Sequence, residues 1–376
     1  MSVRPSHKRA STVVPFLHAL NVVCPYYTMF PLDFPLRVLT RHSRKGGAIL
    51  DPYCGRGTTN FAARLRGLRS WGIDSNPLAA ALADAKLRSA TSEQVIHAAR
   101  RILQTTPPRR YRIPRGEFWR RAFHEDTLDQ ICRLRAGLRR NCKSDARVIL
   151  RAIILGALHG PLRKSAPSYF SNQCPRTFAP KPQYAVNFWK QRGLDPPKVD
   201  VLEVIRRRSR RCLAKLPARA RGAVVRGDSR KPELFGGKRQ FDWVITSPPY
   251  YGMRTYIPDQ WLRNWFLGGP ARVDYTNANQ LQHTSPARFV AGLRKVWTNA
   301  AAVCRKGARL VVRFGGINDR RQDPLTLLKR SLDDTPWRCQ TARAAGNADT
   351  GRRQARQFTT RARPAIREYD VYAILD

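Results

Sequence analysis

The chain is poor in acidic residues, and this is the strongest feature of its composition. It has 26 Asp and Glu against 70 Lys and Arg, which gives a formal net charge of +44 at pH 7. An excess of this size indicates a polyanionic partner, and nucleic acid fits it better than a membrane surface. No stretch approaches the roughly 20 apolar residues that a bilayer-spanning helix needs. The alternative is a solvated, Arg-rich surface.

Other missing features narrow the class of protein. The eight cysteines form no Cys-x-x-Cys pair, so a zinc site is not indicated, and we expect the reduced thiols of a cytoplasmic protein. The start of the chain has no clear small-residue cleavage site, so we expect no signal peptide. The absence of a Gly-x-Gly-x-x-Gly fingerprint disfavours a nicotinamide dehydrogenase.

Apolar strands and helices alternate in two parts of the chain. The first part predicts strands over 47–50 and 70–73 and helices over 58–65 and 77–87. The alternation resumes with strands over 222–225, 241–245, 309–314 and 368–375 and helices over 288–303 and 324–332. Such units form parallel sheets with right-handed crossovers. The predicted fold is therefore a doubly wound, Rossmann-like α/β sheet.

A basic stretch with helical periodicity separates these two parts. The periodicity covers 93–103, 128–138, 146–158 and 199–213, and a loop rich in proline and aromatic residues covers 160–182. One sheet domain split by a largely helical insert is the simplest account. We predict an N-terminal part of the sheet domain over 1–88, the insert over 89–220 and a C-terminal part over 221–376.

Two short segments that follow buried strands carry most of the functional signal. They are Asp51-Pro-Tyr-Cys-Gly-Arg-Gly-Thr-Thr59 and Thr246-Ser-Pro-Pro-Tyr250. In the first, Gly55 and Gly57 lack side chains, so backbone amides can approach a small cofactor closely. An ordinary strand-to-helix turn is the alternative. The second segment places a polar oxygen, two stiff prolines and an aromatic face at the end of a strand.

Together the segments resemble those of S-adenosylmethionine-dependent DNA amino-methyltransferases of the cytosine-N4 type. The first, which we term the cofactor loop (residues 51–59), is similar to the family pattern Asp-Pro-Phe-Cys-Gly-Ser-Gly-Thr-Thr, with Tyr53 and Arg56 as departures. The resemblance implies that Asp51 accepts a hydrogen bond from the ammonium group of S-adenosylmethionine. It also implies that Asp74 receives the ribose hydroxyls and Asp228 the adenine amino group.

Upstream, the segment 24–31 resembles the one that packs against the methionine end of the cofactor in this family. Packing of an aromatic cluster is the alternative there, as helix capping is for Asp74 and a turn for Asp228. The predicted cofactor contacts are Thr28, Phe30, Asp51, Tyr53, Cys54, Gly55, Gly57, Thr58, Asp74, Asn76, Asp228 and Thr246.

The second segment, termed the catalytic segment (residues 246–250), suits methylation of an exocyclic base nitrogen. That amine is a poor nucleophile, and acceptors on its hydrogens stabilise the positive charge that develops as the methyl group arrives. Ser247 offers a side-chain oxygen, the Pro248 carbonyl a second acceptor, and Tyr250 a ring that stacks on the base. The predicted catalytic residues are Ser247, Pro248, Pro249 and Tyr250.

The target base has to leave the duplex to reach such a site. Tyr251, Trp261 or Trp265 are candidates to fill or flank the gap, with core packing as the alternative for the tryptophans. In the insert, we predict DNA contacts from four basic residues, with a solvated lid loop as the alternative. They are Arg163, Lys164, Arg176 and Lys181.

The resemblance therefore predicts a methyltransferase that modifies N4 of cytosine in double-stranded DNA. It is expected to be cytoplasmic and associated with the nucleoid of a prokaryote, with a cognate restriction endonuclease as a candidate partner. Ser-Pro-Pro-Tyr is typical of cytosine-N4 enzymes, although many of these have the two loops in reversed order. The alternatives are an adenine-N6 DNA or guanine-N2 RNA methyltransferase, and a non-catalytic DNA-binding protein on the same fold.

Overall fold

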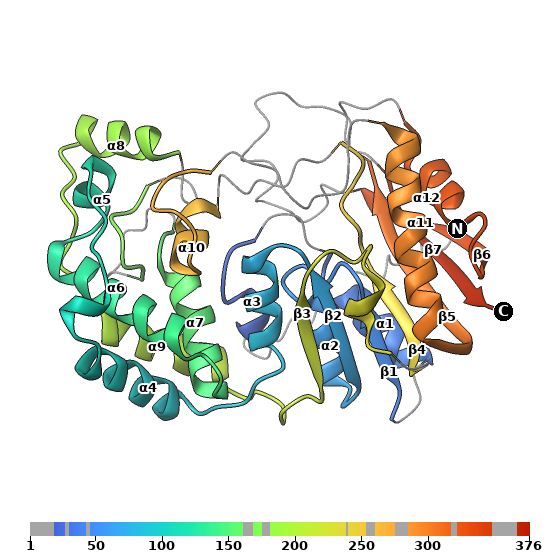
Figure 1. Ribbon diagram of the computed structural model, residues 1–376, viewed down its shortest axis with the longest axis horizontal. Helices are drawn as coiled ribbons and strands as arrows, with labels where there is room; N and C mark the ends of the chain where they lie inside the picture. Colours follow the sequence, from blue (N-terminus) through green and yellow to red (C-terminus); the bar gives the residue numbers. More distant parts are fainter. Residues whose placement is uncertain are drawn as a thin grey trace, which may run out of the picture.

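The computed structural model describes residues 19–26, 30–42, 46–160, 168–174, 181–237, 240–252, 260–274, 285–316, 322–347 and 367–376. Within them lies a seven-stranded sheet of order β3-β2-β1-β4-β5-β7-β6 (Figure 1). The strands are β1 (Ala48–Asp51), β2 (Arg69–Asp74), β3 (Gly222–Arg226), β4 (Phe241–Thr246), β5 (Cys304–Gly315), β6 (Trp337–Asn347) and β7 (Arg367–Leu375). β1 to β5 pair in parallel, and β7 is antiparallel to both of its neighbours. The doubly wound, Rossmann-like sheet is confirmed.

Helices cover both faces of the sheet because successive side chains of a strand point to opposite faces. On one face, α1 (Asp33–His42) and α2 (Thr58–Leu65) share a core with Ile49 and Ile245. On the other, α11 (Pro286–Val303) and α12 (Pro324–Leu332) share a core with Leu50 and Val244. The short strands β1 and β4 are thus buried on both sides, as their apolar sequences predict.

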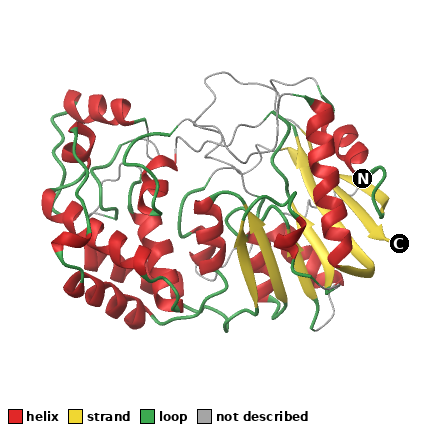
Figure 2. Cartoon of the chain, in the orientation of Figure 1, coloured by secondary structure: helices red, strands yellow, loops and turns green. Residues whose placement is uncertain are grey.

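The remaining helices form a second body, here termed the helical body, beside the edge strand β3, as Figure 2 shows. They are α4 (Ser92–Thr105), α5 (Glu117–Ala122), α6 (Glu125–Arg140), α7 (Asp145–Ala157), α8 (Pro182–Gln191), α9 (Val201–Leu213) and α10 (Trp261–Phe266), and α3 (Pro77–Ala85) lies between this body and the sheet. α10 comes from beyond the catalytic segment, so this body extends past the predicted insert. The predicted domain boundaries stay a prediction.

An aromatic cluster anchors α10 in the helical body. The Trp261 ring lies edge-on to Phe118 and Trp119, with centroid distances of 4.8 and 5.6 Å. Trp265 lies 4.7 Å from Trp119, and both tryptophans of α10 are buried. Core packing is therefore the role that the structure gives these tryptophans, and they do not offer a surface to a base.

Arg64 of α2 holds the two chain segments that connect the sheet domain to the helical body. Its buried guanidinium donates to the carbonyl oxygens of Lys86 and Arg88, at 2.8 and 2.7 Å, where the chain leaves for the insert. It also donates to those of Ala218, at 3.0 Å, and Pro217, where the chain returns. One side chain thus satisfies four carbonyl oxygens of two segments that are far apart in sequence.

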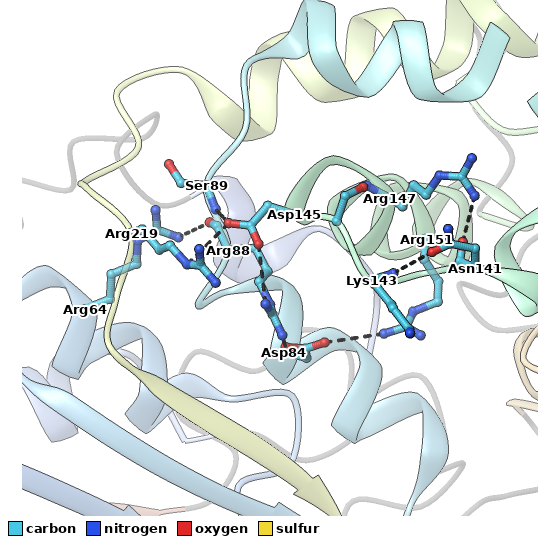
Figure 3. A network of polar contacts seen from close by, with 11 residues as sticks. Arg64, Asp84, Arg88, Ser89, Asn141, Lys143, Asp145, Arg147, Arg151 and Arg219 are labelled. Carbon is cyan, nitrogen blue, oxygen red and sulfur yellow. Dashed lines mark hydrogen bonds and ion pairs between the residues drawn. The ribbon is translucent and has the colours of Figure 1, made fainter. Parts of the chain in front are cut away.

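Acidic side chains complete this junction (Figure 3). Asp145, in the first turn of α7, accepts a hydrogen bond from the Ser89 amide at 3.0 Å and forms ion pairs with Arg88 and Arg219. Asp84 of α3 pairs with Arg88 at 2.8 Å and with Arg151 of α7 at 3.7 Å. The helical body is therefore held to the sheet domain by charge pairs as well as by apolar packing.

Replacing Arg64 with methionine is expected to destabilise the protein by about 3 kcal/mol, because carbonyl oxygens of both connecting segments lose their donor. Arg66→Met is the matched control, since Arg66 ends the same helix and is exposed. Thermal unfolding of the purified variants measures the difference. Equal melting temperatures for the two variants would contradict the role given to Arg64.

No described helix is both long enough and apolar enough to cross a bilayer.

Candidate functional site

The cofactor loop and the catalytic segment meet at the carboxyl ends of adjacent strands. β1 leads into the first and β4 into the second, and the chain adds β2 and β3 on one side of β1 but β4 and β5 on the other. Such a switch point is where open α/β sheets bind their ligands. The Thr246 hydroxyl donates to Asp51 Oδ1 at 2.6 Å, and the Thr59 hydroxyl donates to the Ile245 carbonyl at 3.2 Å. The segments therefore form one site.

Asp51 is the buried acid at the centre of this site. Its side chain is 1% exposed, and Oδ1 accepts hydrogen bonds from Thr246 and from the Tyr53 amide, the latter at 3.1 Å. Oδ2 is buried without a hydrogen-bond partner in the described part of the chain. Burial raises the pKa of Asp51 to about 7. A carboxylate oxygen held in this way has a free acceptor position for a cationic donor.

Asp74, at the end of β2, holds the cofactor loop in place. Its Oδ2 accepts from the Gly55 amide at 2.9 Å and its Oδ1 from the Asn76 amide at 2.8 Å, and burial raises its pKa to about 6. The cap of α3 is Asn76, whose side-chain oxygen accepts from the Leu78 amide at 2.9 Å. Capping is therefore not the task of Asp74, which lies at the strand end where the ribose contact is predicted.

The two glycines of the loop differ in what surrounds them. Gly57 has φ +78°, and a Cβ there would lie 2.7 Å from the Ala83 Cα of α3, so close packing of α2 on α3 requires glycine. Gly55 has φ +51°, and a Cβ there would meet no atom within 4 Å among the described residues. Open space beside Gly55 is what close approach of a ligand to the loop backbone needs.

Gly57→Ala is expected to destabilise the protein by about 2–4 kcal/mol, because it adds a backbone clash to an unfavourable φ. Gly67→Ala is the matched control, since Gly67 has φ +67° but open space around it, and about 1 kcal/mol is expected there. Thermal unfolding of both variants separates the clash from the φ strain. A similar loss in the two would show that the packing of α2 on α3 does not require Gly57.

The other predicted cofactor residues lie around the same strand ends. Cys54 and Thr58 are buried, whereas Tyr53 is half-buried, with its ring 6.4 Å from Trp297. The Asp228 carboxylate follows β3 and receives Arg230 Nε, which lies 3.0 Å from each of its oxygens. A contact of Asp228 with an adenine amino group therefore has to coexist with this ion pair.

In the catalytic segment, Ser247 is half-buried and follows the last residue of β4 directly. Pro248 is buried and Pro249 half-buried. Tyr250 is 8% exposed, and its hydroxyl donates to the Glu368 carboxylate of β7. Its ring lies edge-on to Phe314 at 5.5 Å. The Tyr250 side chain is therefore fixed at its hydroxyl by Glu368 and along its ring by Phe314.

The predicted nucleic-acid contacts are placed only in part. Tyr251 is 6% exposed, with its ring edge-on to Phe289 at 5.4 Å, so it lies in the core in this structure. Lys181 is exposed and directly precedes α8. Arg163, Lys164 and Arg176 lie outside the described residues.

The two predicted cofactor contacts upstream of the loop are also placed only in part. Phe30 is half-buried, with its ring 5.4 Å from that of Phe34. Thr28 lies outside the described residues.

Metal chemistry has no ligand set in the described part of the chain. No group of three or more His, Cys, Asp or Glu gathers there, and all eight cysteines are free thiols.

Glu368 is a site residue that the sequence analysis did not predict. It lies far along the chain from Tyr250 and belongs to no motif, so no local signal points to it.

The comparison with known families agrees with this site. Residues 3–84 match the family model for N6 and N4 methyltransferases, described as DNA methylase. The match includes β1, the cofactor loop and β2 and ends before the catalytic segment. No curated protein matches the chain significantly.

Several solved methyltransferases are similar to the chain, at low sequence identity and with low TM-scores. One from Methanosarcina mazei, S-adenosylmethionine-dependent, is 10% identical, with 92% of this chain and 98% of that chain covered and a TM-score of 0.35. An rRNA methyltransferase from Streptomyces viridochromogenes is 14% identical, with 94% and 91% covered and a TM-score of 0.34. Magnesium protoporphyrin IX methyltransferase from Synechocystis is 11% identical, with 92% and 78% covered and a TM-score of 0.35. Values this low indicate no substrate for the present chain.

Proposed function

We propose that the chain is an S-adenosylmethionine-dependent DNA methyltransferase that transfers a methyl group to N4 of cytosine. The observation that carries the proposal is the 2.6 Å hydrogen bond between Thr246 and Asp51, which joins the catalytic segment to the cofactor loop. A polar residue at a strand end and a glycine loop are each common alone. Their direct contact at a switch point between parallel strands is what a two-substrate site requires.

The residues present fit S-adenosylmethionine as the cofactor. Asp51 Oδ2 is a buried acceptor without a partner in the described chain, and it suits the ammonium group of the methionine end. The open space beside Gly55 admits the ligand close to the loop, and Asp74 lies at the adjacent strand end for the ribose hydroxyls. When bound, the cofactor supplies an electrophilic methyl group on a sulfonium ion.

The catalytic segment prepares the amine that receives this methyl group. The Ser247 hydroxyl and the Pro248 carbonyl accept hydrogen bonds from the two amine hydrogens, which favours a pyramidal nitrogen and stabilises its developing positive charge. Tyr250 is the proposed stacking residue for the base; its ring is 8% exposed in this structure and is held by Glu368 and Phe314. Transfer is direct and in line, so no cysteine nucleophile is needed.

The substrate is double-stranded DNA with the target base turned out of the helix. The net charge of +44 favours a polyanion, and binding through phosphates depends on such cations. We extend the proposal to the basic side chains of the insert, among which Lys181 is exposed. A cognate restriction endonuclease is the proposed partner.

Specificity for cytosine rests on Ser247, because Asp at this position is commoner among adenine-N6 and guanine-N2 enzymes of the family that the sequence resembles. Adenine N6 in DNA is the second candidate, since the order of the two loops differs from that of many cytosine-N4 enzymes.

Transfer from methyl-labelled S-adenosylmethionine tests the reaction. The protein is incubated separately with unmethylated genomic DNA and with total RNA, and the label in the precipitated polymer is counted. We expect label in DNA. Label in RNA alone would favour the guanine-N2 alternative, and cofactor binding without transfer to either polymer would favour a non-catalytic DNA-binding protein.

A further inference from the structure

The cofactor loop contains a buried cation that no described carboxylate neutralises. Arg56, between Gly55 and Gly57, is 6% exposed. Its Nε is buried without a hydrogen-bond partner in the described part of the chain. The family pattern that the loop resembles has a small residue here, so this arginine is a feature of the present chain.

A second buried basic side chain belongs to the end of α3, the helix on which Gly57 of the loop packs. Lys86, at the end of α3, is fully buried, and its Nζ donates to the neutral Asn21 Oδ1 at 2.7 Å. The pKa of Lys86 is well below its usual value because of burial and then because of the positive charge of Arg56. Burial likewise lowers the pKa of Arg56 to about 10. Within the described residues, neither cation is paired with a carboxylate.

Charges of both signs act on the Cys54 thiol of the loop. The pKa of Cys54 is raised by burial and then by the carboxylates of Asp74 and Asp51, and the Lys86 ammonium opposes this rise. The loop and its neighbours therefore hold two carboxylates, Asp51 and Asp74, and two basic groups, Arg56 and Lys86, and no ion pair joins them among the described residues. A buried, unpaired charge is costly, so each set calls for an ion of opposite sign in the functional complex.

The methionine end of the cofactor supplies both ions on one carbon atom, an ammonium and a carboxylate. We propose that Arg56, supported by Lys86, binds the carboxylate of S-adenosylmethionine while Asp51 binds its ammonium. This rests on the proposed cofactor and adds the group that fixes its charged end. A DNA phosphate is a poor alternative occupant, because both cations are buried and a polymer reaches only the surface.

Decarboxylated S-adenosylmethionine tests this directly, because it keeps the sulfonium, the adenosine and the amine but lacks the carboxylate. Dissociation constants of both ligands are measured by calorimetry for the wild-type protein, Arg56→Met and the exposed control Arg66→Met. We expect the wild type and the control to bind the intact cofactor about tenfold or more tightly than the decarboxylated one. Arg56→Met should bind the two ligands with similar affinity.

Removal of an unpaired buried cation should leave the ligand-free protein as stable as before or more stable, so the thermal unfolding of Arg56→Met supports or opposes the inference independently. Equal affinity of the wild-type protein for the two ligands would overturn the inference but leave the cofactor assignment intact. If the wild type bound neither ligand, both the inference and the proposed function would fail.

Discussion

Ser247→Ala is expected to slow methyl transfer about 10²–10³-fold without weakening cofactor binding. The magnitude is that of removing one positioned hydrogen-bonding group that stabilises charge developing in a transition state. Ser247 directly follows β4 and is half-buried, so loss of its hydroxyl should leave the strand and the neighbouring Thr246–Asp51 bond in place. Single-turnover transfer of labelled methyl to DNA measures the rate, and calorimetry measures cofactor affinity.

The matched control is Ser92→Ala, because the Ser92 hydroxyl donates to the carboxylate of the adjacent, exposed Glu93 at the start of α4. This variant should transfer methyl at the wild-type rate. One such group normally contributes about 10²-fold or more to the rate. If Ser247→Ala kept more than about a tenth of the wild-type rate, the catalytic role given to Ser247 would be wrong.

Asp51→Asn is expected to weaken S-adenosylmethionine binding about 10–100-fold at pH 8. The substitution keeps the shape and an acceptor for Thr246 but removes the charge that receives the ammonium, and a hydrogen bond to a charged group contributes about 1.5–3 kcal/mol. Calorimetric titration with the cofactor measures this. Asp242→Asn is the control, because Asp242 lies at the opposite end of the sheet and bonds the Ala48 amide.

The pH dependence of binding provides a second measure of Asp51. Burial raises its pKa to about 7, above the roughly 3.9 of an unfolded chain. The charged form of Asp51 is therefore disfavoured in the ligand-free fold. Its ionisation lowers the free energy of unfolding of the ligand-free protein as the pH rises from about 4 through 7. Ammonium binding requires the charged form, so cofactor affinity should rise about tenfold between pH 6 and pH 8.

Asp74 has a pKa of about 6, so its ionisation contributes to the rise in cofactor affinity near pH 6. Asp51→Asn should flatten the rise above pH 7, where Asp51 alone still titrates. A wild-type affinity that does not change between pH 6 and pH 8 would contradict the proposed contact between Asp51 and the ammonium.

The parallel part of the fold was predictable because its signals are local. The helix expected over 58–65 agrees with α2 (Thr58–Leu65), since glycines precede and follow it. The strands at 48–51 and 241–246 are short apolar runs that end in polar residues, as strands buried on both faces do. The contact between Asp51 and Thr246 depends on the strand order that the structure shows, because both residues end adjacent parallel strands.

The edge strand β6 and the long-range contacts around the site could not be predicted in this way. β6 (Trp337–Asn347) is an edge strand with mostly exposed side chains, so its pairing with β7 depends on backbone bonds that leave no apolar pattern. The contact of Tyr250 with Glu368 and the proximity of Arg56 and Lys86 join residues of different elements. Neither pair has a periodicity or a motif by which the sequence could reveal it.

The most direct test of the account is the identity of the methylated nucleoside. DNA incubated with the protein and isotopically labelled S-adenosylmethionine is digested to nucleosides and analysed by mass spectrometry, with Ser247→Ala in parallel. We predict labelled N4-methylcytosine from the wild-type protein and almost none from the variant. Labelled N6-methyladenine in its place would contradict the assignment of the base, and equal label from the variant would contradict the assignment of the site.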